Sequence, residues 1–217
     1  MKLIVQKAPI RTKSTLNDLI TYLQNSTKDL NVFEKAYVIF VWFHENIIYD
    51  IDNKKNLAEV NPEGVYKIGK TVCEGYSRLY KYIAQQLGIN VLYITGMVSD
   101  DIFSQFDTHA WNILVVEGNN YLIDVTFGSG TCNGNTYEII LKEFYFCAEP
   151  EYLIFTHFPK DSKWQLLKNP LNNDEFTKLA RFNYLFFEYF RGSSKLNYVI
   201  NKKEGIIRLY KKNLIVK

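Results

Sequence analysis

The stretch that decides the fold of this 217-residue chain is GKTVCEGYS, residues 69–77, which carries a cysteine where a helix is expected to begin. From Cys73 to Gly88 the apolar residues recur every three or four positions, as on one face of a helix. These apolar residues are Tyr76, Leu79, Tyr80, Ile83 and Leu87. Gly88 suits the helix end, because glycine adopts the left-handed backbone conformation without strain. The pattern predicts a helix over 73–88, with Cys73 in or just before its first turn.

The start of a helix is a favourable position for a reactive thiol. Unpaired backbone N–H groups and the positive end of the helix dipole stabilise a thiolate there, and such sites lower a cysteine pKa from about 8.5 to roughly 3.5–7.5. The alternative is that Cys73 is a small buried core residue, as free cysteines often are. Gly75 costs the helix on the order of 1 kcal/mol, and we expect another part of the chain to approach the backbone closely there.

A histidine and an aspartate follow on a predicted β-hairpin. Its two strands are the runs 111–116 and 121–126, which are rich in aliphatic and β-branched residues. The segment EGNN, residues 117–120, lies between them and is a turn signal. His109 comes just before the first run, and Asp124 lies in the second.

The position of the turn decides whether these two side chains can meet. A loop at 117–118 pairs Asp124 with Trp111, on the same face as His109 and about 7 Å from it along the strand. A loop at 118–119 separates them by roughly 13 Å, too far without a bulge. We adopt the first register, in which a side-chain hydrogen bond can span the gap.

Taken singly, His109 is a core or surface histidine and Asp124 a strand-end residue that caps a turn. Together with Cys73 they supply what nucleophilic catalysis by a thiol requires: a nucleophile, a base that takes its proton and a group that orients the base. The sequence therefore predicts a catalytic triad of Cys73, His109 and Asp124.

These residues and their neighbours resemble the transglutaminase-like superfamily of cysteine enzymes, and within it the kyphoscoliosis peptidase branch. The similar motifs are Trp42 with ENIIYD (45–50), VCEGY (72–76), HAWN (109–112), DVTFG (124–128), EPE (149–151), HFP (157–159) and WQLL (164–167). The resemblance spans about residues 35–190. It is specific for the family and says little about the substrate.

The resemblance implies an α+β fold of the papain-like or transglutaminase-like kind, with the cysteine-bearing helix packed on an antiparallel sheet. It implies a cysteine protease, amidase or acyltransferase that acts on amide bonds of a protein or peptide, without calcium or another cofactor. Trp42 and Trp111 are candidate walls of the substrate site, with core packing as the alternative. His44 and His157 are interpreted as structural. A non-catalytic binding or scaffold protein on the same fold is the alternative function.

Composition narrows the class of protein further. A net charge of +3 is too small to indicate nucleic acid or a membrane surface as a partner. The three cysteines have no CxxC spacing, so neither zinc nor a disulfide framework is indicated, although Cys132 and Cys147 remain a possible pair. No apolar run reaches the ~18 residues of a membrane span. The apolar run within residues 1–6 is too short for a signal peptide, so we expect a cytoplasmic protein, or a secreted one whose signal has been removed.

We expect a helical segment at 1–30, a catalytic domain at 31–195 and a strand-like extension at 196–217, a candidate start of a further β-domain. The predicted elements are a helix within 14–30, a helix from Asn31 to about Tyr49, a polar loop over 52–69, a strand at 91–98, loops over 99–108 and 128–136, a partly helical stretch at 141–157 broken at 149–151, an aromatic segment at 179–190 and a strand at 205–216.

Overall fold

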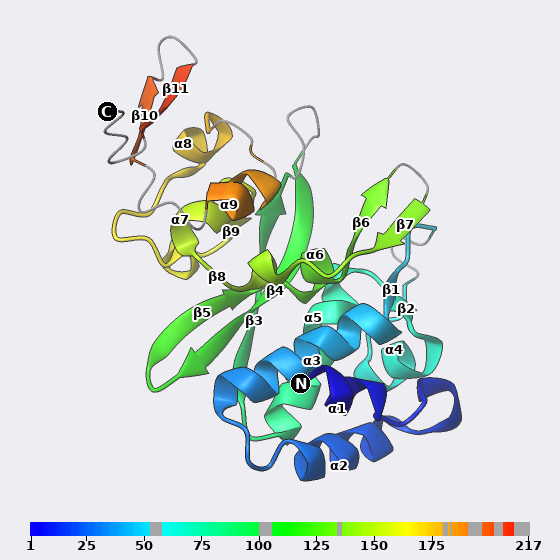
Figure 1. Cartoon of the computed structure of the whole chain (residues 1–217). Helices are drawn as coiled ribbons and strands as arrows, with labels where there is room; N and C mark the ends of the chain where they lie inside the picture. Colours follow the sequence, from blue (N-terminus) through cyan, green and yellow to red (C-terminus); the bar gives the residue numbers. More distant parts are fainter. Residues whose placement is uncertain are drawn as a thin grey trace, which may run out of the picture. The chain divides into compact units, whose positions relative to one another are not determined.

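The chain divides into two compact units, which are described separately (Figure 1). The first unit holds residues 1–95 and 109–148, and the second holds residues 96–108 and 149–217. The structure, a computed structural model, describes residues 1–52, 58–99, 106–133, 136–179, 182, 184–190, 197–201 and 206–210.

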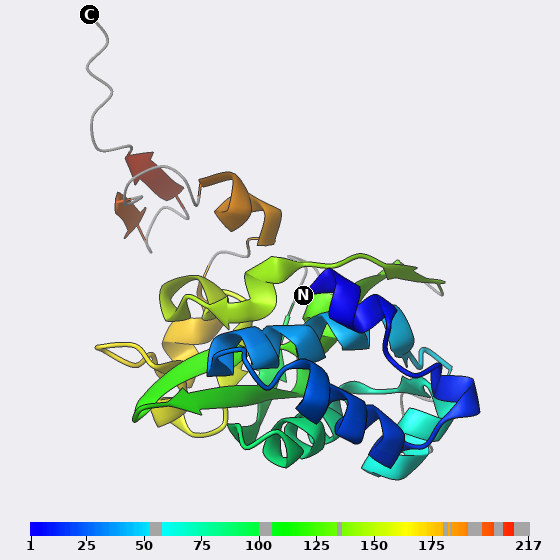
Figure 2. The same cartoon turned by 60° about the horizontal axis from the view of Figure 1, so that its bottom comes forward.

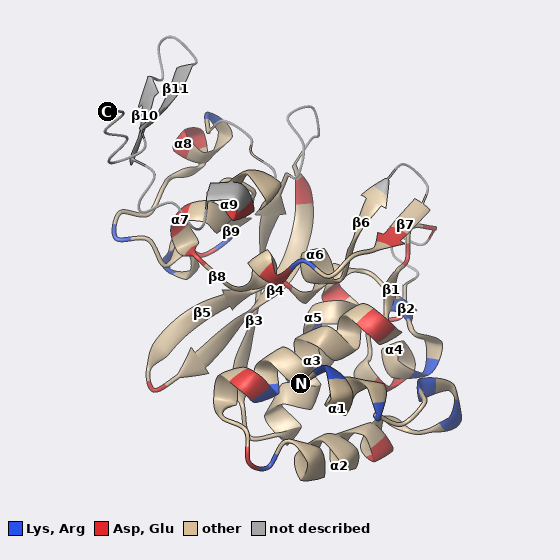
Figure 3. Ribbon diagram, in the orientation of Figure 1, with Lys and Arg blue, Asp and Glu red and all other residues tan. Residues whose placement is uncertain are grey.

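The first unit combines helices with an antiparallel sheet, which confirms the predicted α+β class (Figure 2). Its helices are α1 (Lys2–Gln6), η1 (Arg11–Lys13), α2 (Leu16–Ser26), α3 (Val32–Asn46), α4 (Pro62–Ile68), α5 (Cys73–Gln86), α6 (Val125–Ser129) and η2 (Glu143–Tyr145). Its strands are β1 (Ile48–Tyr49), β2 (Lys70–Thr71), β3 (Asn90–Val98), β4 (Asp107–Val116), β5 (Asn119–Ile123), β6 (Gly130–Asn133), β7 (Thr136–Ile139) and β8 (Phe146–Ala148); the last residues of β3 and the first of β4 belong to the second unit. Basic and acidic residues are interspersed along its helices and loops (Figure 3).

Helix α3 lies in the core of this unit. Its start at Asn31 is the predicted one: the Asn31 side chain accepts a hydrogen bond from the Glu34 N–H, and the Glu34 carboxylate accepts one from the Asn31 N–H. Residues 38–43 are all buried, as expected of a helix that is apolar on every side. The helix ends at Asn46 rather than near Tyr49, because Ile48 and Tyr49 form the strand β1, which pairs with β2.

Helix α5 forms as predicted and packs against α3. Tyr76, Leu79, Tyr80 and Ile83 are fully buried on its apolar face. The hydroxyl of Tyr76 donates to the Ile47 carbonyl at 2.8 Å, and that of Tyr80 donates to a carbonyl of α3 at 3.0 Å. Two buried tyrosines therefore join the cysteine-bearing helix to its neighbour and satisfy their own polar groups.

The sheet of the first unit has the strand order β8-β5-β4-β3. The pairing of β4 with β5 begins at Val116 and Asn119, so Glu117 and Gly118 form the two-residue turn. Both turn residues have positive φ, 50° and 78°, as this kind of hairpin turn requires. The register that brings His109 and Asp124 to one face is confirmed.

Several predicted loops are regular structure. The loop predicted over 52–69 is wrong for residues 62–68, where Pro62 opens α4 and Gly69 ends it in the left-handed conformation. The strand predicted at 121–126 stops at Ile123, because the next residue caps α6. The predicted loop over 128–136 includes β6 and the first residue of β7, which pair antiparallel, and a side chain at Gly130 would clash with β7.

The stretch 141–157 also differs from its prediction. It contains η2 and β8 and then α7 (Pro150–Leu153), so the proline begins a short helix instead of breaking a long one. Cys132 and Cys147 form no disulfide with each other. No helix within the described residues is long and apolar enough to cross a membrane.

The second unit begins with the end of β3, which pairs antiparallel with β9 (His157–Pro159). Its other elements are α7, η3 (Ser162–Gln165), α8 (Asn173–Thr177), α9 (Tyr184–Phe190), β10 (Asn197–Asn201) and β11 (Ile206–Tyr210). The predicted aromatic segment packs its phenylalanines against Tyr152 and Phe155. The strand predicted at 205–216 is present at 206–210, and its remaining residues lie outside the described ones, as do residues 100–105 of the loop predicted over 99–108.

The close approach expected at Gly75 is made by Thr71. A Cβ on Gly75 would lie 1.9 Å from the Thr71 Oγ1 atom and 2.9 Å from its Cβ, and Thr71 is fully buried. We therefore predict that Gly75→Ala lowers the free energy of unfolding by about 1–3 kcal/mol, the usual cost of overpacking. Urea denaturation measures this. In a Thr71→Ala background the same change should cost clearly less; an equal cost in both backgrounds would contradict the assigned clash.

Candidate active site

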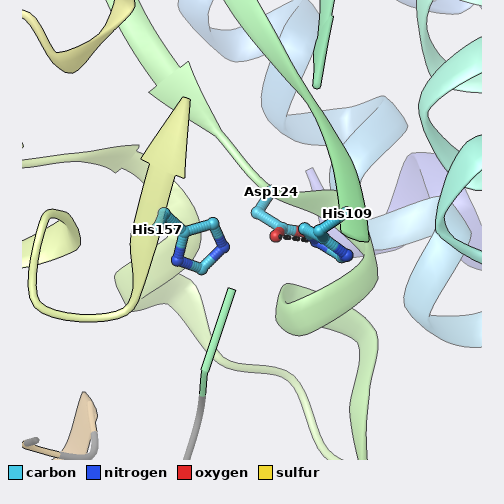
Figure 4. A group of neighbouring side chains, drawn as sticks. All are labelled: His109, Asp124 and His157. Carbon is cyan, nitrogen blue, oxygen red and sulfur yellow. Dashed lines mark hydrogen bonds and ion pairs between the residues drawn. The ribbon is translucent and has the colours of Figure 1, made fainter. Parts of the chain in front are cut away.

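His109 and Asp124 form a buried pair. His109 lies on β4 and Asp124 follows the last residue of β5, so the hairpin register carries both side chains to one place. The His109 Nε2 atom lies 2.6 Å from the Asp124 Oδ2 atom, and Figure 4 shows the carboxylate facing the ring. The two residues are only 6% and 1% exposed, so little water screens the pair.

Both carboxylate oxygens of Asp124 are used. Oδ2 meets the imidazole, and Oδ1 accepts a hydrogen bond of 2.9 Å from the Phe127 N–H, which caps α6. The Asp124 N–H also donates to the Tyr145 carbonyl at 3.0 Å. Asp124 therefore both caps α6, through Oδ1, and contacts the His109 imidazole, through Oδ2.

The His109 ring is fixed on its faces as well as at its edge. The Trp111 ring stacks on it with centroids 5.9 Å apart, and the Phe127 ring lies 4.9 Å away. Because Asp124 accepts from Nε2, that nitrogen carries the hydrogen, and Nδ1 is the nitrogen left to meet the thiol.

Cys73 is the first residue of α5 and is half-buried. Val72, which precedes it, provides no side-chain cap to the first turn of this helix. The His109 side chain and the Ala110 backbone both act on the thiol and lower its pKa. The structure thus brings the three predicted residues Cys73, His109 and Asp124 together, on one helix start and one hairpin.

The pKa values of the thiol and the imidazole move in opposite directions. Burial acts to raise the pKa of Cys73, but the hydrogen bond and charge of His109 and the Ala110 backbone outweigh it and lower that pKa. Burial acts to lower the pKa of His109, but the charge and hydrogen bond of Asp124, with those of Cys73, raise it to about 10. Between these two pKa values the pair is a thiolate beside an imidazolium.

Two polar residues hold the helix start against the strand. The Ser77 hydroxyl lies 2.8 Å from the Ala110 carbonyl and 2.9 Å from the Cys73 carbonyl. The Asn112 side-chain amide donates to the carbonyls of Ser77 and Leu92 at 3.1 and 3.2 Å. Both residues are fully buried, so these hydrogen bonds fix Cys73 relative to His109. Sequence reasoning missed both, although an asparagine inside the apolar run of β4 signals a buried hydrogen-bonded position.

The other candidate residues are two tryptophans and two further histidines. Trp42 is fully buried on α3 and stacks on Tyr66 at 5.8 Å, which corresponds to the core-packing alternative. Trp111 is also fully buried, and its contact with the site is the stack on His109. The His44 Nδ1 atom lies 3.1 Å from the Ser129 carbonyl. His157, also labelled in Figure 4, belongs to the second unit, where its Nδ1 atom lies 2.7 Å from the Thr156 hydroxyl.

Comparison with known proteins agrees with the motifs. Residues 18–123, which include Cys73 and His109, match the family model of the transglutaminase-like superfamily. Kyphoscoliosis peptidase of Mus musculus and that of Homo sapiens are each 31% identical over 187 residues, 81% of this chain and 28% of the relative. Hillarin of Drosophila melanogaster is 25% identical over 82% of this chain and 24% of its own length. The chain therefore spans less than a third of these relatives.

A solved structure described as a putative cysteine protease from Cytophaga hutchinsonii is also similar. Its TM-score is 0.40 at 21% sequence identity, over 58% of this chain and 41% of that one.

The pKa of Cys73 is lowered and that of Cys147 is raised, so the two thiols should differ in reactivity. A lower pKa leaves more thiolate at a given pH, so iodoacetamide should alkylate Cys73 rapidly at pH 7. Burial raises the pKa of Cys147 to about 11, so its alkylation should become appreciable only at much higher pH. Peptide mass spectrometry resolves the two sites within one sample.

The variant His109→Gln removes the charge that lowers the pKa of Cys73. Alkylation of Cys73 at pH 7 should slow by at least tenfold, while that of the exposed Cys132 provides the reference rate. An unchanged Cys73 rate in this variant would show that the imidazole does not activate the thiol.

Proposed function

Since this chain belongs to the transglutaminase-like superfamily, we propose that it is a cysteine acyl-transfer enzyme that acts on amide bonds of a protein or peptide. Cys73 is the nucleophile, His109 the base and then the acid, and Asp124 the residue that orients the imidazole. The observation that carries the proposal is the buried 2.6 Å pair of His109 and Asp124, together with the position of Cys73 at a helix start, where the His109 side chain lowers the pKa of the thiol.

The proposed reaction proceeds in two steps. The Cys73 thiolate attacks the amide carbonyl, and the Cys73 N–H at the start of α5 is one donor to the oxyanion that forms. The His109 imidazolium then gives its proton to the departing amine as the carbon–nitrogen bond breaks, which leaves a thioester on Cys73.

In the second step a water molecule or an acceptor amine attacks the thioester. His109 accepts the proton of the attacking group, the carbon–sulfur bond breaks, and the product is a carboxylic acid or a new amide. Asp124 remains a carboxylate throughout and stabilises the imidazolium. Access of the acceptor to the thioester decides between hydrolysis and amine transfer.

A binding or scaffold protein on the same fold is the alternative. The buried carboxylate beside His109 favours the enzyme, because desolvating an ion pair is costly and a scaffold needs no imidazolium at this position. A binding role would leave the half-buried thiol without chemical use.

The proposal predicts that a simple activated ester acylates Cys73. With p-nitrophenyl acetate at pH 7, intact-mass measurement should detect one acetyl group, and peptide mapping should assign it to Cys73. Cys73→Ala should abolish it, and Asp124→Asn should slow it by about 10²–10⁴-fold, because the imidazole loses its orienting charge. Cys132→Ser is the matched control and should acylate at the wild-type rate. Equal acylation of Cys73→Ala and wild type would overturn the assignment of the nucleophile.

A further inference from the structure

A pocket of about 260 Å³ lies beside α5, the helix that carries Cys73 at its start. The residues that line it all belong to the first unit and are Pro62, Arg78, Lys81, Tyr82, Gln85 and Tyr93. Its volume is just below the roughly 300–1,000 Å³ of small-molecule sites. The pocket therefore has room for one or two side chains of a bound peptide rather than for a large ligand.

The lining is cationic and aromatic. It has two positive side chains, Arg78 and Lys81, and none of the described lining residues is acidic. The Arg78 guanidinium lies over the Tyr93 ring, 5.4 Å from its centroid, which holds the cation at the pocket. The Gln85 amide adds a neutral hydrogen-bonding group. This combination recognises a carboxylate, since a guanidinium and an ammonium both donate to it with a favourable charge.

The pocket lies within reach of a peptide bound at Cys73. Arg78 and Lys81 follow Cys73 by five and eight residues on one helix, about 7.5 and 12 Å along its axis at 1.5 Å per residue. An extended peptide covers these distances with about two to four residues at roughly 3.3 Å each. Burial raises the pKa of Tyr93, and the negative charges of Glu74 and Cys73 add to this effect, so the pocket wall is electrostatically coupled to the thiol.

Arg78 already holds a carboxylate that a substrate can replace. The Glu74 Oε1 atom lies 2.7 Å from the Arg78 Nη2 atom and 2.8 Å from its Nε atom. The two side chains are 41% and 51% exposed, and such pairs contribute only about 0–1 kcal/mol. A carboxylate that enters the pocket can therefore take the place of Glu74 at little cost, with Lys81 as a second cation.

We propose that this pocket is a specificity subsite that binds an acidic side chain of the peptide substrate, two to four residues from the bond attacked by Cys73. The proposal rests on the proposed function, because it assumes that a peptide lies across the start of α5. It makes Arg78 and Lys81 the residues that select an acidic substrate.

Peptide binding to the Cys73→Ala variant tests the subsite without requiring turnover. Fluorescence anisotropy with labelled octapeptide libraries, in which one position at a time is glutamate or glutamine, should give at least tenfold tighter binding for glutamate at one position. Adding Arg78→Gln and Lys81→Gln should remove that preference. Lys13→Gln with Lys28→Gln removes the same charge from exposed positions outside the pocket and should retain the preference.

Two results would overturn the subsite: equal binding of glutamate and glutamine peptides at every position, or a glutamate preference that both double variants reduce equally. The latter would mean attraction by net charge alone. Failure of the proposed function is seen separately, as the absence of acetylation on Cys73 by p-nitrophenyl acetate. A glutamate preference in a protein that is not acetylated would support the pocket as a peptide-binding site and overturn the proposed enzymatic function.

Discussion

One imidazole, that of His109, must meet a carboxylate at one nitrogen and a thiol at the other, and the first unit is organised around this requirement. The Asp124 carboxylate follows the neighbouring strand, and its Oδ2 atom lies 2.6 Å from the His109 Nε2 atom, because a two-residue turn sets the register of the hairpin. The Cys73 thiol lies at the start of α5. Hydrogen bonds of Ser77 and Asn112 connect this helix to β4, the strand that carries His109. A slip of the strand by one residue would turn the histidine away from both partners.

The same arrangement explains why burial does not neutralise the site. Removing a carboxylate or an imidazolium from water costs several kcal/mol per ion unless a partner compensates. Here each charged group has one: Asp124 has the His109 ring and the Phe127 N–H, and Cys73 has the ring and the Ala110 backbone. The raised pKa of His109 and the lowered pKa of Cys73 express this mutual stabilisation. In the proposed mechanism, this charge separation is in place before any substrate binds.

Local patterns were sufficient to predict the parts of the fold that carry the site. The apolar period after Cys73 predicted α5, and the turn residues predicted the register that pairs His109 with Asp124. The sequence also predicts Asn31 as the N-cap of α3. Each of these is set by neighbours in the sequence, through helix periodicity, side-chain caps or turn geometry.

What the sequence did not reveal depends on distant contacts or on very short elements. Helix α6 has five residues, too few for a periodic pattern, and its first two residues continue the β-branched run 121–126 that predicts a strand. Pro62 and Gly69 bound a helix of seven residues that resembled a loop. The pocket beside α5 arises only when the separate segments α4, α5 and β3 pack together.

The most direct test of the account is the titration of the His109 ring, followed by ¹⁵N chemical shifts and assigned with the His109→Gln variant. The account predicts that both ring nitrogens of His109 stay protonated until the pH approaches about 10, because Asp124 and the Cys73 thiolate hold the imidazolium. In Cys73→Ala the titration should move to lower pH, since one of the two negative partners is lost. A His109 ring that titrates near the ordinary value of about 6.5, unchanged by Cys73→Ala, would contradict the coupled triad.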